Sequence, residues 1–450
     1  MSTDSSNSGN NEGLIFGLND RPNLRQSLFA ALQHLLAIYL PIITPPLLLA
    51  LAMGLDPKTT QYLIGASLLV SGVATFIQVR KVGPIGSGIL SIQGTSFSFV
   101  PPLIAAGKAG GLPMVFGLTI AGSFIEIFIS RFHGAIRRAI SPLVSGIVVT
   151  LIGLTLIGVA VEQCAGGAQA KALGEFGSPT NLTVAASVIL TIIIFNNFKN
   201  IYLRMGAITF GLVVGYIVSF AFGTVDFSSG TDAGSIIAPL PLKFGLSFDI
   251  SLFVPVALIY VITVMETIGD LTATSVVSGE PVEGDLYYKR ISGGVLGDGI
   301  NSLIAGLFGS MPNTTFSQNN GIIQLTGIAS RKVGYFIAGM LALLGLCPFT
   351  SAIFSAMPAP VLGGATLLMF GTVAAVGIRI ISLTKIDARS TMIMAISFGC
   401  GIGVVMHPEG LSALPPFIAE MFSSGIASGG IAAIVANLVL PRRGTRTHSA

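Results

Sequence analysis

The sequence predicts an all-α polytopic membrane protein, and its composition carries most of that prediction. Of the 450 residues, 52% are hydrophobic and only 9% are charged, whereas a soluble globular protein carries roughly 25% charged residues. The apolar residues form repeated runs close to the ~20 residues that a helix needs to cross a hydrocarbon core. A soluble enzyme, a secreted disulfide-rich protein and a nucleic-acid-binding protein do not fit this composition, although the net charge is +4.

Apolar runs separated by charged or turn-rich breaks divide the chain into fourteen segments, so we expect fourteen membrane spans. The basic residues test this division. With a cytoplasmic N-terminus, only four of the 23 Lys and Arg residues, namely Lys58, Lys108, Lys171 and Lys243, fall on the outer side. Because basic residues concentrate in cytoplasmic loops, both termini are expected to be cytoplasmic. The approximate limits of the segments are 27–52, 61–78, 87–106, 113–130, 141–160, 183–198, 206–222, 251–275, 291–309, 312–328, 333–355, 361–378, 390–406 and 417–440.

The two ends of the chain are polar. Residues 1–26 are expected to form a disordered cytoplasmic N-terminus, and residues 441–450 a cytoplasmic tail. No short apolar run followed by a cleavage site marks a signal peptide. The three cysteines share no metal-ligand spacing, so the sequence predicts neither a disulfide framework nor a metal site.

Two segments do not fit an uninterrupted helix. Residues 91–102 and 313–321 alternate polar and apolar side chains, and we expect short β-strands there. Within them, Thr-Ser-Phe-Ser at 95–98 and Thr-Thr-Phe-Ser at 314–317 are near-copies, separated by almost half of the chain. They lie in the third and the tenth segment. Seven segments therefore separate them, and an odd number reverses the orientation in the membrane.

This reversal predicts two inverted repeats of seven spans each. The first repeat would comprise residues 27–222, and the second residues 251–440. Residues 223–250 would form an extracytoplasmic linker between them. Matching broken segments in two inverted repeats point to the central binding site of a transporter.

Three acidic residues inside the predicted spans are candidates for that site. Glu266 and Asp270 are four residues apart and share one helical face, and Asp298 lies in the following span. All Lys and Arg residues fall in loops or near span ends, and an unpaired ionised carboxylate at the bilayer centre costs roughly 2.5–3.5 kcal/mol. We therefore expect at least one of the three to be protonated at neutral pH, which suits a proton-coupled step. The alternative for Asp270 or Asp298 is a helix cap.

Other polar side chains in the spans are weaker candidates. Glu126 is close in sequence to Arg131, and we expect the two to form an ion pair at the cytoplasmic edge. His34, in the first span, is either a hydrogen-bonded structural residue or a support of the site. Gln318 and Asn319 offer both donors and acceptors to a planar polar solute.

Residues 318–327, Gln-Asn-Asn-Gly-Ile-Ile-Gln-Leu-Thr-Gly, fit the signature Gln/Glu/Pro-Asn-x-Gly-x-x-x-x-Thr-Arg/Lys/Gly of the nucleobase–ascorbate transporter family, which includes the xanthine and uracil permeases. The chain resembles this family over roughly residues 24–440. The resemblance implies core and gate domains that move by an elevator-like mechanism, and a homodimer. It also implies a protein embedded in the lipid of the cell membrane, which in a bacterium is the inner membrane. Further motifs resemble the family in the same order at 33–34, 93–96, 266–270 and 298–299.

The resemblance also assigns roles to single residues. Glu266 would hold the N–H edge of a nucleobase and Gln318 a second edge, while Ser96 and Phe97 would line the site. Asp298, together with Glu266, would serve proton coupling. The supporting residues would be His34, Asp270, Asn319, Thr326 and Gln93.

The substrate follows from the same comparison. Gln318 indicates the purine branch, with xanthine or uric acid as substrate, and Ser96 leaves both purines open. The proton would be the coupling ion, with no other cofactor and no nucleic-acid partner. The alternatives are a uracil or hypoxanthine/guanine permease of the same family, and an anion transporter of the same general fold. An intramembrane Gly-x-Gly-Asp protease does not fit, because Leu296-Gly297 precede Asp298.

Overall fold

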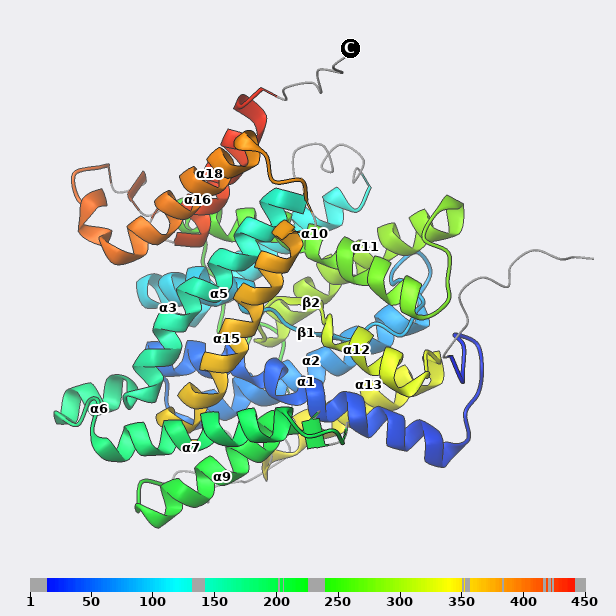
Figure 1. Cartoon of the computed structure of the whole chain (residues 1–450), viewed down its shortest axis with the longest axis horizontal. Helices are drawn as coiled ribbons and strands as arrows, with labels where there is room; N and C mark the ends of the chain where they lie inside the picture. Colours follow the sequence, from blue (N-terminus) through cyan, green and yellow to red (C-terminus); the bar gives the residue numbers. More distant parts are fainter. Residues whose placement is uncertain are drawn as a thin grey trace, which may run out of the picture.

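The structure is a computed structural model that describes most of the chain. The described residues are 14–131, 142–200, 203–204, 206–225, 239–349, 352, 357–382, 384–415, 418–419, 422 and 425–441. Within them the protein consists of helices around one small sheet (Figure 1). Most of the two ends that were expected to be polar flanks, residues 1–13 and 442–450, lies outside the described residues.

The first two helices show how local sequence sets helix limits. Helix α1 (Leu24–Met53) begins at Asn23, whose side chain accepts a hydrogen bond from the main-chain N–H of Gln26 in a capping box. It ends at Gly54, whose φ of 64° is left-handed and suits glycine. Helix α2 (Pro57–Arg80) starts with a proline, whose fixed φ suits the first helical position.

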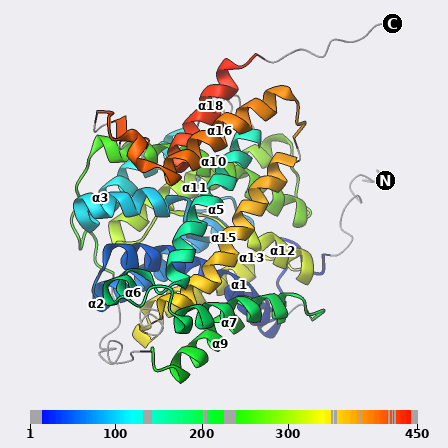
Figure 2. The ribbon, with the colours of Figure 1, turned by 60° about the vertical axis from the view of Figure 1, so that its left-hand side comes forward.

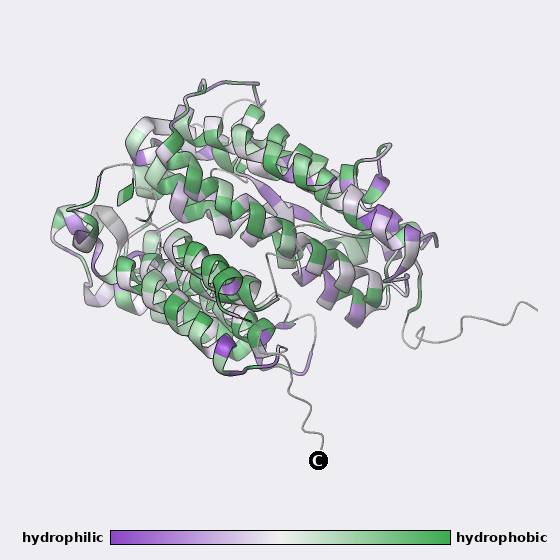
Figure 3. Ribbon diagram, turned by 90° about the horizontal axis from the view of Figure 1, so that it is seen from above, coloured by the Kyte–Doolittle hydropathy of each residue, from purple (hydrophilic) through white to green (hydrophobic). Residues whose placement is uncertain are grey.

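The helices pack into two groups, which Figure 3 shows from above. The first group contains α1, α2, α3 (Val100–Ile129), α10 (Ile250–Val277), α11 (Gly284–Phe308), α12 (Gln318–Thr326) and α13 (Arg331–Leu346). The second group contains α5 (Pro142–Cys164), α6 (Gly167–Leu173), α7 (Pro179–Asn196), α9 (Ala207–Ala221), α15 (Ala359–Ser382), α16 (Ala388–Met406) and α18 (Gly425–Val439). Helices α5 and α15 of the second group run side by side (Figure 2).

Nine helices in the described part of the chain are long and apolar enough to cross a membrane. This supports a multi-pass membrane protein, but nine is fewer than the fourteen predicted segments. The third and fourth segments share helix α3, which is interrupted at Gly110 and Gly111. The tenth segment holds only a short strand and the nine-residue helix α12. Helices α9 and α18 are apolar but shorter than 18 residues.

The sheet lies in the first helix group and joins the two near-copies found in the sequence. Strand β1 (Gln93–Thr95) pairs antiparallel with β2 (Asn313–Thr315). Thr95 opposes Asn313, and Gly94 opposes Thr314. Thr95 and Thr314 are equivalent residues of the two copies, and Gly94 and Asn313 precede them. Exchanging the two copies converts the pair Thr95–Asn313 into the pair Thr314–Gly94, so the pairing has local two-fold symmetry.

Residues 14–23 differ from the expected disordered N-terminus. The main-chain N–H groups of Ile15 and Phe16 donate to Gly327 O at 2.7 and 3.0 Å, and Ala329 N donates to Phe16 O at 2.9 Å. Leu18 is buried in a small apolar cluster. The prediction missed this order because it weighed the polar residues of the segment and not the apolar side chains among them. These contacts connect the N-terminal segment to the loop between α12 and α13.

Candidate functional site

The two strands place two helix starts beside the sheet. Strand β1 leads through Ser96 into a short 3-10 helix, η1 (Phe97–Phe99), and then into α3. Strand β2 leads through Phe316 and Ser317 into α12. The first N–H groups of a helix have no partner within the helix and carry a partial positive charge. In α12, Asn319 N and Asn320 N already donate to Phe316 O and Ser317 O at 3.2 and 3.0 Å, so the main-chain donors that this helix can offer are limited to the N–H groups before Asn319.

The two acids of α10 meet the sheet region from one helical face, as their spacing predicted. Both Glu266 and Asp270 are partly buried. The hydroxyl of Thr315, in β2, donates to Asp270 Oδ2 at 3.1 Å. The side chain of Ser98, which follows β1, interacts with the carboxyl group of Glu266. Asp270 is thus bound by a hydroxyl group of β2, and Glu266 interacts with a hydroxyl residue of η1, which follows β1.

Asp298 occupies a more enclosed position than the acids of α10. Its side chain lies on α11 and is 1% exposed. Thr267 of α10 donates to Oδ2, and Gln78 Nε2 of α2 lies 3.4 Å from Oδ1. The same Gln78 amide donates to Gly294 O at 3.2 Å. Asp298 therefore belongs to a buried network that joins three helices, and its carboxyl does not open toward solvent.

The signature residues of α12 have different surroundings. Gln318, the first residue of the helix, is exposed. Asn319 is buried, and its Nδ2 donates to Leu90 O at 2.5 Å, which fixes α12 to the segment before β1. Thr326 donates to Ile322 O at 2.8 Å at the end of the helix. Of these three predicted site residues, only Gln318 presents its polar group outward.

Two predicted supporting residues are buried without hydrogen bonds from their side chains. His34 is 0% exposed, and neither of its ring nitrogens has a partner in the described part of the protein. The Gln93 side chain is also buried, and although neither of its polar atoms makes a well-formed hydrogen bond to the described residues, it interacts with the carboxyl group of Asp298. The main-chain N–H of Gln93 donates to Thr75 Oγ1 at 3.0 Å. Such groups are rare in folded proteins and require an explanation. They remain candidates for supporting roles.

Phe97 connects the site to the second helix group. Its ring is partly buried and meets the ring of Phe370, on α15, edge to face with centroids 5.5 Å apart. Ser96, beside it, is buried, and its N–H donates to Pro312 O at 2.9 Å. The predicted lining residues thus lie where the two groups of helices meet.

The predicted ion pair between Glu126 and Arg131 is wrong. Its side chain is 1% exposed, and Oε1 accepts a hydrogen bond from Thr263 of α10 at 2.6 Å. Arg131 is exposed, and no ion pair joins the two described side chains. The expectation failed because nearness in sequence does not fix the helical face. Thr119 and Gly122 lie on the face of Glu126, and this row of small or polar residues is the signal that would have revealed a buried acid.

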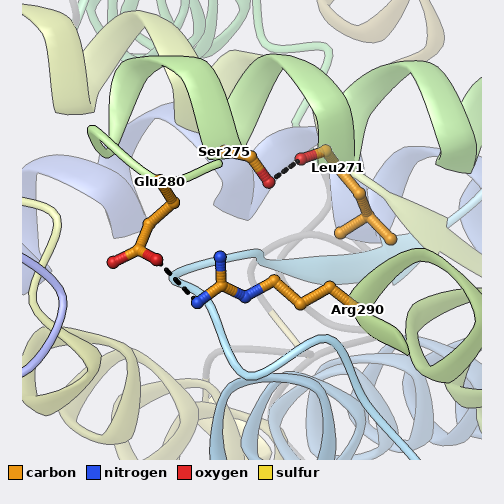
Figure 4. A network of polar contacts seen from close by, with 4 residues as sticks. All are labelled: Leu271, Ser275, Glu280 and Arg290. Carbon is orange, nitrogen blue, oxygen red and sulfur yellow. Dashed lines mark hydrogen bonds and ion pairs between the residues drawn. The ribbon is translucent and has the colours of Figure 1, made fainter. Parts of the chain in front are cut away.

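A buried arginine near the start of α11 does not neutralise the acids of the site. Arg290 Nη2 lies 2.7 Å from Glu280 Oε2, in the connection between α10 and α11 (Figure 4). In the same view, Ser275 donates to Leu271 O at 2.8 Å within α10. The guanidinium of Arg290 is thus paired with Glu280 and not with the acids of the site.

The chain matches a known protein family. The model of the xanthine and uracil permeases, described as "Permease family", matches residues 25–410. The chain belongs to this permease family. As a permease it is a transporter and not an enzyme.

Named members of the permease family are similar over nearly their whole length. Xanthine permease XanP of Escherichia coli strain K12 is 47% identical over 441 residues, which cover 96% of this chain and 95% of that protein. Uric acid permease PucJ of Bacillus subtilis strain 168 is 35% identical over 418 residues, which cover 92% of each chain.

Solved structures show that the permease fold occurs more widely. The transmembrane domain of the cyanobacterial bicarbonate transporter BicA aligns with a TM-score of 0.55 at 14% identity, covering 94% of this chain and 100% of that domain. The anion transporter Slc26a9 of the mouse aligns with a TM-score of 0.59 at 12% identity, covering 93% of this chain and 69% of that protein. At such identities the likeness concerns the fold alone.

Proposed function

We propose that this permease is a proton-coupled symporter that imports a purine nucleobase, xanthine or uric acid, across the cell membrane. The observation that carries the substrate class is the presence of two complementary polar groups on packed elements: the partly buried carboxyl of Glu266 on α10, and the exposed carboxamide of Gln318 at the start of α12, a helix that α10 contacts. A purine dione is planar and alternates N–H donors with carbonyl acceptors. A carboxylate accepts N–H groups, and a carboxamide pairs with an N–H/C=O edge. The names of the xanthine and uric acid permeases that the chain resembles agree with this chemistry.

Proton coupling is assigned to the acids. Asp298 would bind and release the coupling proton, because its carboxyl is buried and its bonds come from uncharged groups, Thr267 and Gln78. Glu266 would contribute through its contact with the substrate. The other candidates, His34, Asp270, Asn319, Thr326 and Gln93, would position the site.

Transport would proceed by an elevator-type motion of the first helix group, as core domain, against the second, as gate domain. The symmetric pairing of β1 with β2 supports two inverted repeats of seven spans. The contact between Phe97 and Phe370 would then change as the core moves. We further propose a homodimer in the membrane with both termini in the cytoplasm.

The principal alternatives are a uracil or hypoxanthine/guanine permease of the same family. An anion transporter is the second alternative, because the fold is shared with anion carriers. An anion site would favour a basic residue at its centre, whereas Glu266 and Asp270 lie here.

The deciding experiment measures uptake of radiolabelled xanthine in cells that lack their own purine permeases. Xanthine should accumulate, unlabelled urate should compete, and a protonophore should stop accumulation. Uracil, hypoxanthine, guanine and bicarbonate serve as competitors for the alternatives. Xanthine uptake no greater than in cells without the permease would refute the proposal.

A further inference from the structure

Glu126 is a buried acid that the proposed function does not use. It lies on α3, and its Oε1 accepts a hydrogen bond from Thr263 at 2.6 Å. Its Oε2 is buried without a hydrogen-bond partner among the described residues. An ionised buried carboxyl without a basic partner is costly, so the geometry favours a proton on this group for part of the time.

The hydroxyl of Thr263 has two acceptors. Thr263 Oγ1 lies 2.6 Å from Glu126 Oε1 and 3.0 Å from the main-chain oxygen of Tyr260. A threonine hydroxyl has one hydrogen to donate. When Glu126 is ionised, that hydrogen can point to Oε1. When Glu126 is protonated, the carboxyl can donate to Oγ1 and the hydroxyl turns to Tyr260 O. The site therefore accommodates both protonation states with small rotations.

Glu126 also lies beside Asp298 across a close helix contact. A Cβ on Gly299, the residue after Asp298, would stand 3.1 Å from Glu126 Cβ and 2.8 Å from Ile127 N. Thr263, which binds Glu126, lies one helical turn before Thr267, which binds Asp298. One face of α10 thus holds two acids from two different helices.

The charges around Glu126 are acidic. The titratable groups that face it are Asp298 of α11 together with Glu266 and Tyr260 of α10. Arg131, near the end of the same helix, is exposed and makes no ion pair with it. Ionisation of one acid therefore favours the protonated form of the other.

We propose that Glu126 is a second proton-carrying residue of the transport cycle, paired with Asp298 through the Thr263–Thr267 face of α10. This inference rests on the proposed proton-coupled transport. Glu126 binds a proton while Asp298 is ionised. When it releases that proton to water, it is left as a carboxylate that accepts from Thr263.

The test compares Glu126→Gln with Glu175→Gln, a matched change of an exposed glutamate in the loop between α6 and α7. Gln keeps an acceptor for Thr263 and cannot release a proton. We expect Glu126→Gln to reduce xanthine accumulation driven by a proton gradient at least about tenfold, and to reduce xanthine exchange at equal pH on both sides much less. Glu175→Gln should leave both unchanged. Wild-type accumulation by Glu126→Gln would overturn the proposal.

A second pair of variants decides the case in which Glu126→Gln fails to fold. Thr263→Val removes the donor that stabilises the carboxylate, so Glu126 should hold its proton to higher pH. The pH of half-maximal uptake should then rise by roughly one unit, and Thr263→Ser should restore the wild-type profile. An unshifted Thr263→Val profile would refute the inference. If instead wild-type accumulation resists a protonophore, proton coupling itself is wrong, and the proposed function fails.

Discussion

The hydroxyl of Thr267 donates a hydrogen bond to Oδ2 of Asp298, which joins α10 to α11 in the buried part of the first helix group. The preceding residue, Glu266, interacts with Ser98 beside the sheet. Of these two adjacent residues of α10, Thr267 thus binds the proposed proton carrier, and Glu266 is the proposed substrate-binding residue. A change in the protonation of Asp298 can therefore affect the position of Glu266, because Thr267 and Glu266 are joined by one peptide unit.

Replacing Glu266 with Gln should strongly reduce uptake. The variant loses the charged acceptor for the N–H edge of a purine, and hydrogen bonds to charged groups contribute about 1.5–3 kcal/mol each. We expect a fall in xanthine uptake of roughly 10-fold to 150-fold at unchanged membrane expression. Uptake of radiolabelled xanthine and an immunoblot of the membrane fraction measure the two quantities. Normal uptake by this variant would refute the site assignment.

Asp298→Asn should uncouple xanthine transport from the proton gradient. Asn keeps an oxygen for Thr267 but cannot carry a proton, so accumulation should stop. Concentrations of xanthine inside and outside cells, measured with and without an imposed pH gradient, test this. The control is Asp285→Asn, an exposed acid at the start of the same helix, which should accumulate xanthine normally. Undiminished accumulation by Asp298→Asn would remove Asp298 from the coupling role.

Gly122 should tolerate no side chain, because α3 and α10 are in close contact there. A Cβ on Gly122 would stand 2.1 Å from Tyr260 Cε2. The Tyr260 ring is buried, and its hydroxyl donates to Thr119 O at 2.8 Å, so it cannot move freely. Overpacking costs about 1–3 kcal/mol. Thermal unfolding in detergent should show a lower Tm for Gly122→Ala, whereas Gly158→Ala, with no atom within 4 Å, should match the wild type or exceed it.

The cap of helix α2 should give a pH-dependent contribution to stability. Asp56 Oδ1 accepts a hydrogen bond from Thr59 N at 3.0 Å, and the bonds from the Thr59 side chain and main chain lower the pKa of the Asp56 carboxyl. Because the folded-state pKa is lowered, the stabilisation is present above the unfolded pKa of ~3.9 and is lost as the pH falls through the folded value. Asp56→Ala should cost about 1 kcal/mol at pH 7.

Unfolding of purified protein at pH 7 and in acid measures this contribution. The difference between the wild type and Asp56→Ala should shrink in acid. Asp56→Asn keeps the acceptor without a titrating group, so its stability relative to Asp56→Ala should not change with pH. An equal cost of Asp56→Ala at both pH values would contradict the assignment.

How far the site could be predicted depends on the kind of signal that each residue carries. The four-residue spacing of Glu266 and Asp270 defines a shared helical face, and the structure has both partly buried beside the sheet. Spacing carries no such information for Glu126, whose buried carboxyl accepts a hydrogen bond from Thr263, 137 residues away in the chain. Asn319 and Gln318 are neighbours in sequence, yet one is fixed to Leu90 and the other is exposed.

By itself, the sequence determined the membrane class, the family and the two broken segments, because composition, short motifs and near-copies are properties of the linear chain. Only the tertiary structure decided which acids share an environment. Contacts such as Thr267 with Asp298, Thr263 with Glu126 and Gly94 with Thr314 join residues far apart in the chain. Such contacts form only when helices and strands pack, and packing depends on which faces meet.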